Sequence, residues 1–240
     1  HLGDSIEREM TIMFIDIRGF TGISQQMTPE ASFKFINMYL HDVGPLIRRN
    51  GGFIDKYLGD GVMALFPDSI AGAAAAAIDV QNALQQMPWP SDSPGIRAGI
   101  GLHHGMLRLG TVGEQARLDV TVVSRVVNLA ARLEKLTRRF DTGIIVSETI
   151  QAALPDREMR RLGSVRVKGI AEYITVYELL DGLPEGMRSA RIQHRDAFDS
   201  AMNSLQAGRT EEANRAFRRI LEEDPGDAAA RYYLSQSAVV

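Results

Sequence analysis

Residues 10–17 carry the stretch MTIMFIDI, an apolar and β-branched run that reaches an acid, Asp16, at its end. Such a run predicts a central strand buried on both faces. Residues 55–66 read DKYLGDGVMALF, which predicts two short strands, 53–58 and 62–66, around a tight Gly-Asp-Gly turn. These two stretches make a β-sheet the centre of the expected fold.

Helices are predicted between and after these strands. Thr28-Pro29-Glu30 is typical of a helix start, and Asn50-Gly51-Gly52 of its end. Hairpins mixed with helices favour an α+β fold, a ferredoxin-like βαββαβ-type, largely antiparallel sheet with flanking helices. The other expected elements are helices at 70–87 and 125–136 and strands at 96–103, 106–112 (paired with the preceding strand across His104-Gly105), 120–123, 143–146, 165–167 and 174–180.

The chain changes character near residue 182. Residues 181–186 read DGLPEG, a composition typical of a linker, and only helical patterns follow. We therefore expect one domain at 1–182 and a small α-helical extension at 183–240. The pattern from Gly208 to Leu234 resembles one tetratricopeptide-type unit. A single unit cannot bury its own apolar face, so it should dock on the domain or on a partner.

Composition excludes several classes of function. A net charge of −3 argues against nucleic-acid binding, which needs a basic surface. The absence of cysteine excludes disulfides, thiol nucleophiles and cysteine zinc sites, and fits a cytoplasmic location. No run is long and apolar enough to cross a bilayer, so we expect no membrane contact by this chain. Because the sequence starts at His1, we expect an upstream sensory or membrane-bound region.

Two aspartates are candidate metal ligands. Asp16 lies at the end of an apolar strand, where a charge is costly unless a cation or hydrogen bonds compensate it. If this strand lies beside the hairpin that carries Asp60, both carboxylates meet at one end of the sheet. Hard oxygen ligands of this kind suit magnesium or manganese, and a pair can hold two ions about 3.5–4 Å apart. The alternative is that Gly-Asp-Gly only shapes a tight turn.

Four motifs lie in order along the chain: FIDIRGFT at 14–21, DKYLGDGVMALF at 55–66, RLDVT at 117–121 with VNLAARLE at 127–134, and VKG at 167–169 with VYEL at 176–179. Together they resemble the motifs of class III adenylyl and guanylyl cyclases, over residues 7–180. The resemblance implies that Asp16, Asp60 and the Ile17 carbonyl bind two divalent ions, Mg²⁺ or Mn²⁺. It also implies that Lys56 and Thr121 read the purine, with lysine donating to adenine N1.

The resemblance further implies an adenylate cyclase that acts in signal transduction. Asn128 and Arg132, one helical turn apart, would orient the ribose and stabilise charge on the α-phosphate. Lys168 would hold the β- and γ-phosphates, and the turn Gly19-Phe20-Thr21 would offer backbone amides to phosphate. The ribose 3′-oxygen of ATP would attack the α-phosphorus, giving 3′,5′-cyclic AMP and pyrophosphate. The family builds each site from two protomers, so a homodimer with shared active sites is expected.

Arg125 departs from the family pattern, because many relatives carry an acid or an amide there. It favours an alternative function, a weak or inactive regulatory pseudo-cyclase that binds nucleotide or a partner protein. A diguanylate cyclase would need a Gly-Gly-Asp/Glu-Glu-Phe type of signature, which LGDGV at 58–62 does not supply. A tetratricopeptide adaptor would need more than one unit. Gly99-Ile100-Gly101 lacks the third glycine of a dinucleotide-binding motif.

Overall fold

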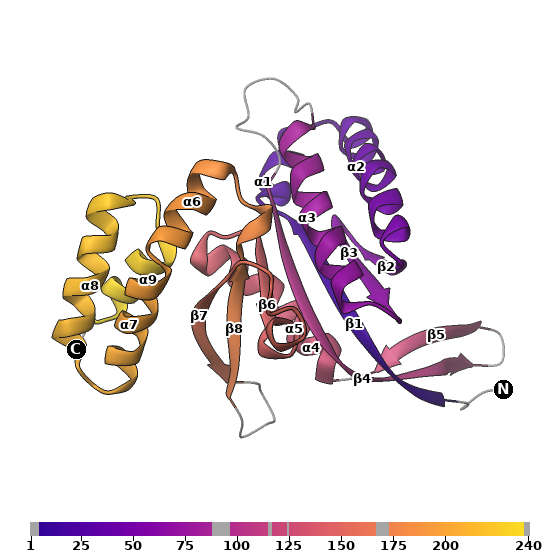
Figure 1. Cartoon of the computed structure of the whole chain (residues 1–240). Coiled ribbons are helices and arrows are strands. Elements are labelled where there is room, and N and C mark those ends of the chain that lie inside the picture. Colours follow the sequence, from indigo (N-terminus) through magenta and orange to yellow (C-terminus); the bar gives the residue numbers. More distant parts are fainter. Residues whose placement is uncertain (1–4, 88–96, 115–116, 124, 167–172, 238–240) are drawn as a thin grey trace.

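A computed structural model of the chain describes residues 5–87, 97–114, 117–123, 125–166 and 173–237, with only the backbone for 5, 111–114, 117–123, 166 and 237. One sheet runs through its centre (Figure 1), with strand order β2-β3-β1-β4-β6-β8-β7 and with β5 paired to β4. The strands are β1 (Ser5–Ile17), β2 (Phe53–Leu58), β3 (Gly61–Phe66), β4 (Ala98–Glu114), β5 (Arg117–Val123), β6 (Ile144–Ser147), β7 (Met159–Arg166) and β8 (Tyr173–Leu179).

The expected α+β fold is confirmed. The neighbouring strands are antiparallel, apart from the parallel pair β4–β6. The first half contains the βαββαβ arrangement: β1, helix α2 (Pro29–Arg49), β2, β3, helix α3 (Ile70–Gln86) and β4. Its four strands lie in the order β2-β3-β1-β4, so the two strands at the ends of this unit, β1 and β4, become neighbours in the sheet centre.

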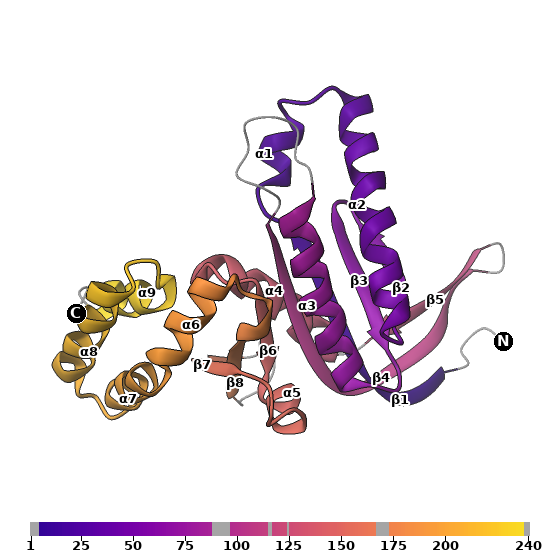
Figure 2. The ribbon, with the colours of Figure 1, turned by 45° about the horizontal axis from the view of Figure 1, so that its top comes forward.

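Helices α2 and α3 cover one face of the sheet (Figure 2). Helix α2 begins as its sequence predicts, with Thr28 Oγ1 accepting a hydrogen bond from the Ala31 amide at 3.2 Å. Helix α3 packs closely because its inner side is made of small residues, and it shares the main core with Ile15 of β1. The fully buried alanines of α3 are Ala73, Ala74, Ala76 and Ala77.

Helix α4 (Arg125–Phe140) packs against β4 at two glycines. A Cβ on Gly99 would lie 2.1 Å from Thr137 Oγ1, and one on Gly101 only 2.3 Å from the Glu134 amide nitrogen. Any side chain at either position would push the helix away from the sheet. The Gly99-Ile100-Gly101 stretch therefore serves helix–sheet packing.

The hairpin turn predicted at His104-Gly105 is wrong. Strands 96–103 and 106–112 were expected to pair across His104-Gly105, but both belong to the continuous strand β4. The reason is that β1 starts earlier than predicted, at Ser5, and pairs along the whole stretch, with Met10 opposite Gly105. Gly105 is not among the glycines with positive φ, which a two-residue hairpin turn would require.

The linker expected at 181–186 is also wrong in part. Leu180 and Gly182 are buried in a short 3₁₀ helix, and a Cβ on Gly182 would lie 2.8 Å from Ile144 Cδ1. The chain is thus held against the sheet before the next helix begins. Four helices follow: α6 (Glu185–Gln193), α7 (Arg195–Gln206), α8 (Thr210–Glu223) and α9 (Ala228–Ser237).

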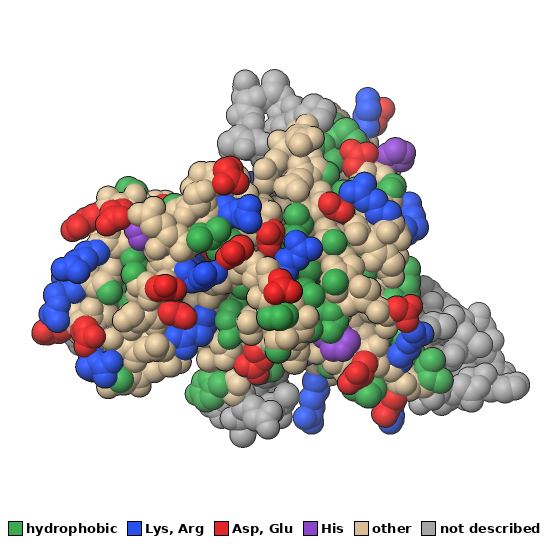
Figure 3. All heavy atoms as spheres, in the orientation of Figure 1, with side chains coloured by type: hydrophobic (Ala, Val, Ile, Leu, Met, Phe, Trp, Pro, Cys, Tyr) green, Lys and Arg blue, Asp and Glu red, His purple; other side chains and the backbone are tan. Residues whose placement is uncertain are grey.

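These four helices, the C-terminal extension, dock on the domain as expected of a lone helical unit. Phe198 and Phe217 of the extension share one core cluster with Leu133 of α4 and Leu162 of β7. The outer surface of the extension carries interspersed acidic and basic side chains (Figure 3). Within the described part of the chain, no helix combines the length and apolarity needed to cross a membrane.

Candidate functional site

Asp16 and Asp60 lie at the same end of the sheet. Strands β1 and β3 are antiparallel with Ile15 opposite Val62, so the end of β1 meets the turn that carries Asp60. A Cβ placed on Gly61 would be 3.6 Å from Asp16 Oδ1. The structure therefore brings together the two carboxylates that the sequence singled out.

These two carboxylates form a centre of negative charge. Burial, followed by the charge of Asp16, raises the pKa of Asp60 above its usual range. One cation compensates in part, because Arg138 of α4 donates a hydrogen bond to Asp16 Oδ2. The side chain of Asp16 is 25% exposed and that of Arg138 is 57% exposed, so solvent reaches this pair.

Glu134 adds a third carboxyl group nearby. It is a buried residue of α4, and burial, followed by the charge of Asp16, raises its pKa to about 7. Among the described residues, Glu134 Oε1 has no hydrogen-bond partner. Tyr39 of α2 is fully buried, and its pKa is raised by burial and by the charges of Asp60 and Asp16, so its hydroxyl stays protonated.

Asp16 and Asp60 fit a divalent cation. They supply hard oxygen ligands, and their mutual repulsion is what a cation would relieve. Arg138 would leave Asp16 for solvent, which its exposure allows. The described residues contain no cluster of three or more His, Cys, Asp or Glu arranged as a complete metal site. A cation here would therefore need water and substrate oxygens as further ligands, as magnesium sites commonly do.

The turn after β1 offers backbone amides beside this centre. Gly19 has a φ of 70°, a left-handed conformation that glycine adopts easily, and helix α1 (Phe20–Ser24) begins directly after it. The Phe20 ring is buried and stacks on Phe35 of α2 at 5.7 Å between centroids. Phe20 thus anchors the turn, and only its backbone, with that of Thr21, is available to a phosphate.

Asn128 and Arg132 lie on the outward face of α4. Both residues are exposed, whereas Leu129 and Leu133 of the same turns are buried. Arg138, which contacts Asp16, is ten residues beyond Asn128, a rise of about 15 Å along a helix. The Asn128 end of α4 is therefore well separated from the carboxylates of the same chain.

A β-bulge determines which way Lys56 faces. The β2–β3 register shifts between Ile54, which pairs with Ala64, and Lys56, which pairs with Met63. Met63 belongs to the core cluster on the α4 side of the sheet, whereas Ala64 belongs to the α2–α3 side. The bulge thus turns Lys56 to the same sheet face as α4, and Lys56 Nζ lies 3.3 Å from Asp55 Oδ2.

Thr121 lies far from Asp16 in the chain's own sheet. It pairs with Gly110 of β4, and Gly110 pairs with Ser5 at the start of β1. Asp16 is eleven positions further along β1, roughly 35 Å at the usual rise per residue. Lys168 lies outside the described residues.

Sequence reasoning missed Arg138 and Glu134 beside Asp16, and also Arg18. Glu134 and Arg138 are four residues apart on α4, a spacing that places them on one helix face. That pair was a usable signal, but nothing in it indicates that this face meets the end of β1. Arg18 lies inside the first motif, two positions after Asp16, and reaches the end of α4, where it donates to the Thr137 carbonyl at 2.8 Å.

The raised pKa of Glu134 predicts how stability depends on pH. The folded state holds the Glu134 proton more tightly than the unfolded chain does. The contribution of this proton to the free energy of unfolding is therefore full below the ordinary pKa of 4.5 and is lost as pH rises through about 7. With a chelator present to remove metal ions, the wild type should therefore lose stability relative to Glu134→Gln between about pH 5 and pH 8. The expected difference in the free energy of unfolding is on the order of 1 kcal/mol after solvent screening.

Thermal melts across this pH range measure the difference. Glu222→Gln, which changes an exposed carboxylate on α8, is the matched control and should follow the wild-type curve. Parallel curves for Glu134→Gln and the wild type would show that Glu134 titrates as an ordinary carboxyl group.

The sequence relatives of this chain include adenylate cyclases. It is 42% identical over 190 positions to an adenylate cyclase of Anabaena cylindrica, covering 74% of this chain and 38% of that protein. It is 32% identical over 246 positions to the terminal-differentiation specific adenylate cyclase of Dictyostelium discoideum, covering 98% of this chain and 12% of that protein. The second match therefore includes the C-terminal extension. The chain spans well under half the length of either relative.

The fold agrees with these relatives. The crystal structure of the guanylyl cyclase Cya2 matches with a TM-score of 0.64 and 32% identity, covering 77% of this chain and 96% of that one. Residues 5–181 match the adenylate and guanylate cyclase catalytic domain family, a span that contains β1 to β8 and both aspartates. The chain belongs to the class III adenylyl and guanylyl cyclases, as a nucleotidyl cyclase catalytic domain followed by a helical extension.

Proposed function

We propose that this chain converts ATP to 3′,5′-cyclic AMP and pyrophosphate, in a homodimer that uses two divalent ions, Mg²⁺ or Mn²⁺. The observation that carries the proposal is the convergence of Asp16 and Asp60 at the end of β1, beside the turn at Gly19. Within a nucleotidyl cyclase domain, this is the place where the charge of two carboxylates lies beside the first backbone amides of a helix.

Each part of the site has a defined task in the proposed reaction. Asp16 and Asp60, with the Ile17 carbonyl, would hold the ions, which when bound lower the pKa of the attacking hydroxyl and neutralise phosphate charge. The amides of Phe20 and Thr21 would bind phosphate oxygens. The ribose 3′-oxygen loses its proton and forms a bond to the α-phosphorus, and the bond to the β-phosphate oxygen breaks, so pyrophosphate leaves in line.

The other half of the site orients the nucleotide. Asn128 would hold the ribose, and Arg132 would stabilise charge on the α-phosphate with its fixed, planar donors. Lys168 would hold the β- and γ-phosphates. No described side chain near Asp16 is placed as a dedicated base, since Glu134 is buried and Tyr39 stays protonated. Positioning and electrostatics would therefore supply most of the rate enhancement.

Two copies of the chain are needed in this proposal. Asp16 lies near the end of β1, whereas Thr121 of β5 lies level with the start of β1, roughly 35 Å away along the strand direction. The two residues therefore cannot contact one nucleotide from the same protomer. Asn128 and Arg132 face outward on α4, where a second copy could present its carboxylates. Exposed apolar side chains continue this surface at Phe53 and Leu58, 43% and 50% exposed. Such a surface favours an isologous dimer with two equivalent sites.

Adenine is the preferred base because Lys56 can donate a hydrogen bond to its N1, whereas guanine carries an N–H at that position. Thr121 is the second purine-reading residue. Both named sequence relatives are adenylate cyclases, but the solved structure with 32% identity is a guanylyl cyclase, so substrate choice is the finer part of the proposal.

The Asp16–Arg138 contact favours the alternative of a weak or inactive pseudo-cyclase, because an arginine competes with a cation for a metal ligand. Arg125, exposed at the first position of α4, adds positive charge near Asn128. The same assay distinguishes the two functions.

Cyclic-nucleotide production by the purified chain tests the proposal, with Mn²⁺ or Mg²⁺ and with ATP and GTP offered separately. We expect cyclic AMP from ATP and at least about 10-fold less product from GTP. Lys56→Glu should lower activity on ATP by on the order of 10²-fold, because a polar group that should pair with adenine is replaced by one that repels its acceptor.

No product from either nucleotide, in a protein shown to be dimeric by analytical ultracentrifugation, would favour the pseudo-cyclase. Equal or better turnover of GTP would overturn the adenine assignment and keep the cyclase.

A further inference from the structure

The C-terminal extension is joined to the catalytic domain by a buried group of charges. Arg160 of β7 donates to Asp227 Oδ2 at 2.5 Å and to Glu178 Oε2 of β8 at 2.7 Å. These three residues are at most 2% exposed. Asp227 precedes α9 and also accepts from the Ala230 amide at 3.1 Å, so its position is tied to the start of that helix.

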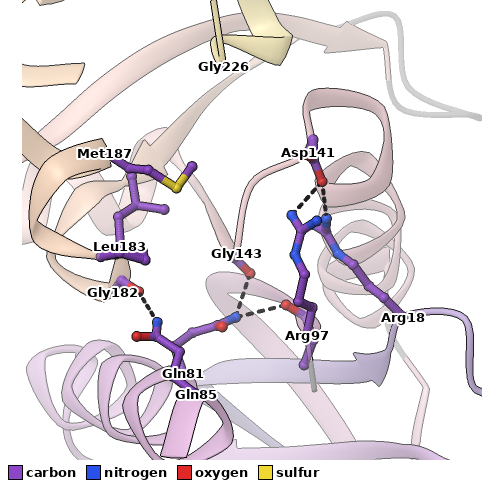
Figure 4. A pocket seen from close by; sticks show the side chains of 12 residues that line it. Arg18, Gln81, Gln85, Arg97, Asp141, Gly143, Gly182, Leu183, Met187 and Gly226 are labelled. Atoms are coloured by element: carbon purple, nitrogen blue, oxygen red, sulfur yellow. Dashed lines mark hydrogen bonds and ion pairs between the residues drawn. The ribbon is translucent and has the colours of Figure 1, made fainter. Parts of the chain in front are cut away.

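The same group of charges continues toward the metal-binding end of β1. The Thr142 hydroxyl donates to Glu178 Oε1, and the Thr142 carbonyl accepts from Arg18. Arg18 also donates to Asp141 Oδ1 at 2.5 Å, and Arg97 meets the same carboxylate (Figure 4). Four buried residues, Asp227, Arg160, Glu178 and Thr142, thus connect the extension to Arg18, which lies two positions after Asp16.

Arg18 is placed to align two elements of the site. It sits at the end of β1 and binds the Thr137 and Thr142 carbonyls, which lie in and just after the last turn of α4. A cation there also interacts favourably with the negative end of the helix dipole. Arg18 lines a cavity of about 400 Å³ between the domain and α6 (Figure 4), and most of its own surface is buried. Through Thr142, Arg18 is connected to Glu178 and so to the group of buried charges at the junction.

Buried ion groups are an expensive way to dock a helical segment. Removing three charges from water costs several kcal/mol per ion, and apolar residues of similar volume often stabilise a protein as well or better. The extension already has an apolar docking surface, in which Tyr233 stacks on Phe140 of α4 at 6.0 Å. The charges are therefore not needed for burial alone, and a role in fixing relative positions accounts for them.

We propose that Asp227 is a positioning residue for the cyclase reaction, acting through Arg160, Glu178, Thr142 and Arg18 on the metal-binding end of β1. The proposal rests on the proposed function, since it assumes that Asp16 binds the cation. Without the Asp227 charge, Arg160 would draw Glu178 fully to itself and weaken the Glu178–Thr142 contact. Arg18 would then lose a fixed partner, and Asp16 would lose its alignment with α4.

The chain offers a matched control for this proposal. Arg161, next to Arg160 on β7, pairs with Asp199 of α7 at 2.8 Å. This pair joins the same two parts of the protein, but Asp199 makes no hydrogen bond or ion pair with Glu178, Thr142 or Arg18 in the described structure, and its side chain is 48% exposed. Asp227→Asn and Asp199→Asn therefore each remove one carboxylate charge from the junction, and only the first interrupts the connection to Arg18.

Three measurements on the whole chain test the proposal. Asp227→Asn should lower kcat about 10-fold. It should also weaken Mn²⁺ affinity about 3- to 10-fold, as expected for an indirect coupling of this size. The Mn²⁺ affinity is measured without nucleotide by electron paramagnetic resonance. Asp227→Asn should also speed amide hydrogen exchange at residues 17–21. Asp199→Asn should change each quantity less than 2-fold. Thr142→Val should reproduce the Asp227→Asn effects, and the double variant should be no worse than either.

Circular dichroism and thermal melts show which variants are folded. If Asp227→Asn unfolds, Thr142→Val still tests the proposal, because it leaves the buried charges in place. Equal effects of Asp227→Asn and Asp199→Asn, or additive effects of Asp227→Asn and Thr142→Val, would show that Asp227 only anchors the extension. If the wild type makes no cyclic nucleotide, the proposed function fails, while hydrogen exchange at residues 17–21 still decides the coupling.

Discussion

Asp16→Asn is expected to lower cyclic AMP formation by about 10³-fold or more, because the missing carboxylate removes several kcal/mol of cation-based charge stabilisation. Asparagine keeps the shape of the side chain and an oxygen for Arg138, so the fold should survive. The loss of one negative charge also relieves the repulsion that raises the pKa values of Asp60 and Glu134. Activity should therefore fall without a loss of thermal stability.

Initial rates at saturating ATP and Mn²⁺, together with thermal melts in a chelator, measure both parts of this result. Asp68→Asn is the control, because Asp68 is a surface carboxylate that also pairs with an arginine, Arg8. That variant should keep wild-type activity. Activity of Asp16→Asn within a few-fold of the wild type would remove Asp16 from the metal site and with it the main support for the proposed mechanism.

Mixing two inactive variants is expected to restore activity. Asp16→Asn lacks the metal half of each site, and Arg132→Ala lacks the transition-state half, so each homodimer should be inactive. In a heterodimer, one of the two sites combines both intact halves. After equal mixing and exchange of subunits, about half of the dimers are mixed with one working site each, so about 25% of wild-type activity should return.

A matched mixture tests the division between the protomers. Asp16→Asn with Asp60→Asn should restore nothing, because both changes lie in the same half and every site in the mixed dimer carries one of them. Recovery in the second mixture would mean that Asp16 and Asp60 of one chain serve different sites. No recovery in the first mixture despite proven subunit exchange would mean that Asp16 and Arg132 of one chain serve the same site. The spacing along α4 and β1 argues against that arrangement.

The sequence was sufficient for the features that depend on local chemistry. An apolar β-branched run predicts β1 and puts Asp16 near its end, and a Gly-Asp-Gly turn predicts the hairpin that carries Asp60. The spacing of Asn128 and Arg132 puts them on one helix face whatever the helix packs against.

Features that depend on which elements meet were decided only by the tertiary structure. The long pairing of β1 with β4 removed the predicted turn at His104-Gly105, and the bulge in β2 set the face of Lys56. Arg138 reached Asp16 across 122 positions, and Arg160 joined Asp227 across 67. A residue's propensity and spacing act over a few neighbours, whereas burial, ion pairing and strand register depend on residues that are distant in the chain. The ligand candidates were therefore readable from the sequence, and their alignment became visible only when the sheet, α4 and the extension were packed together.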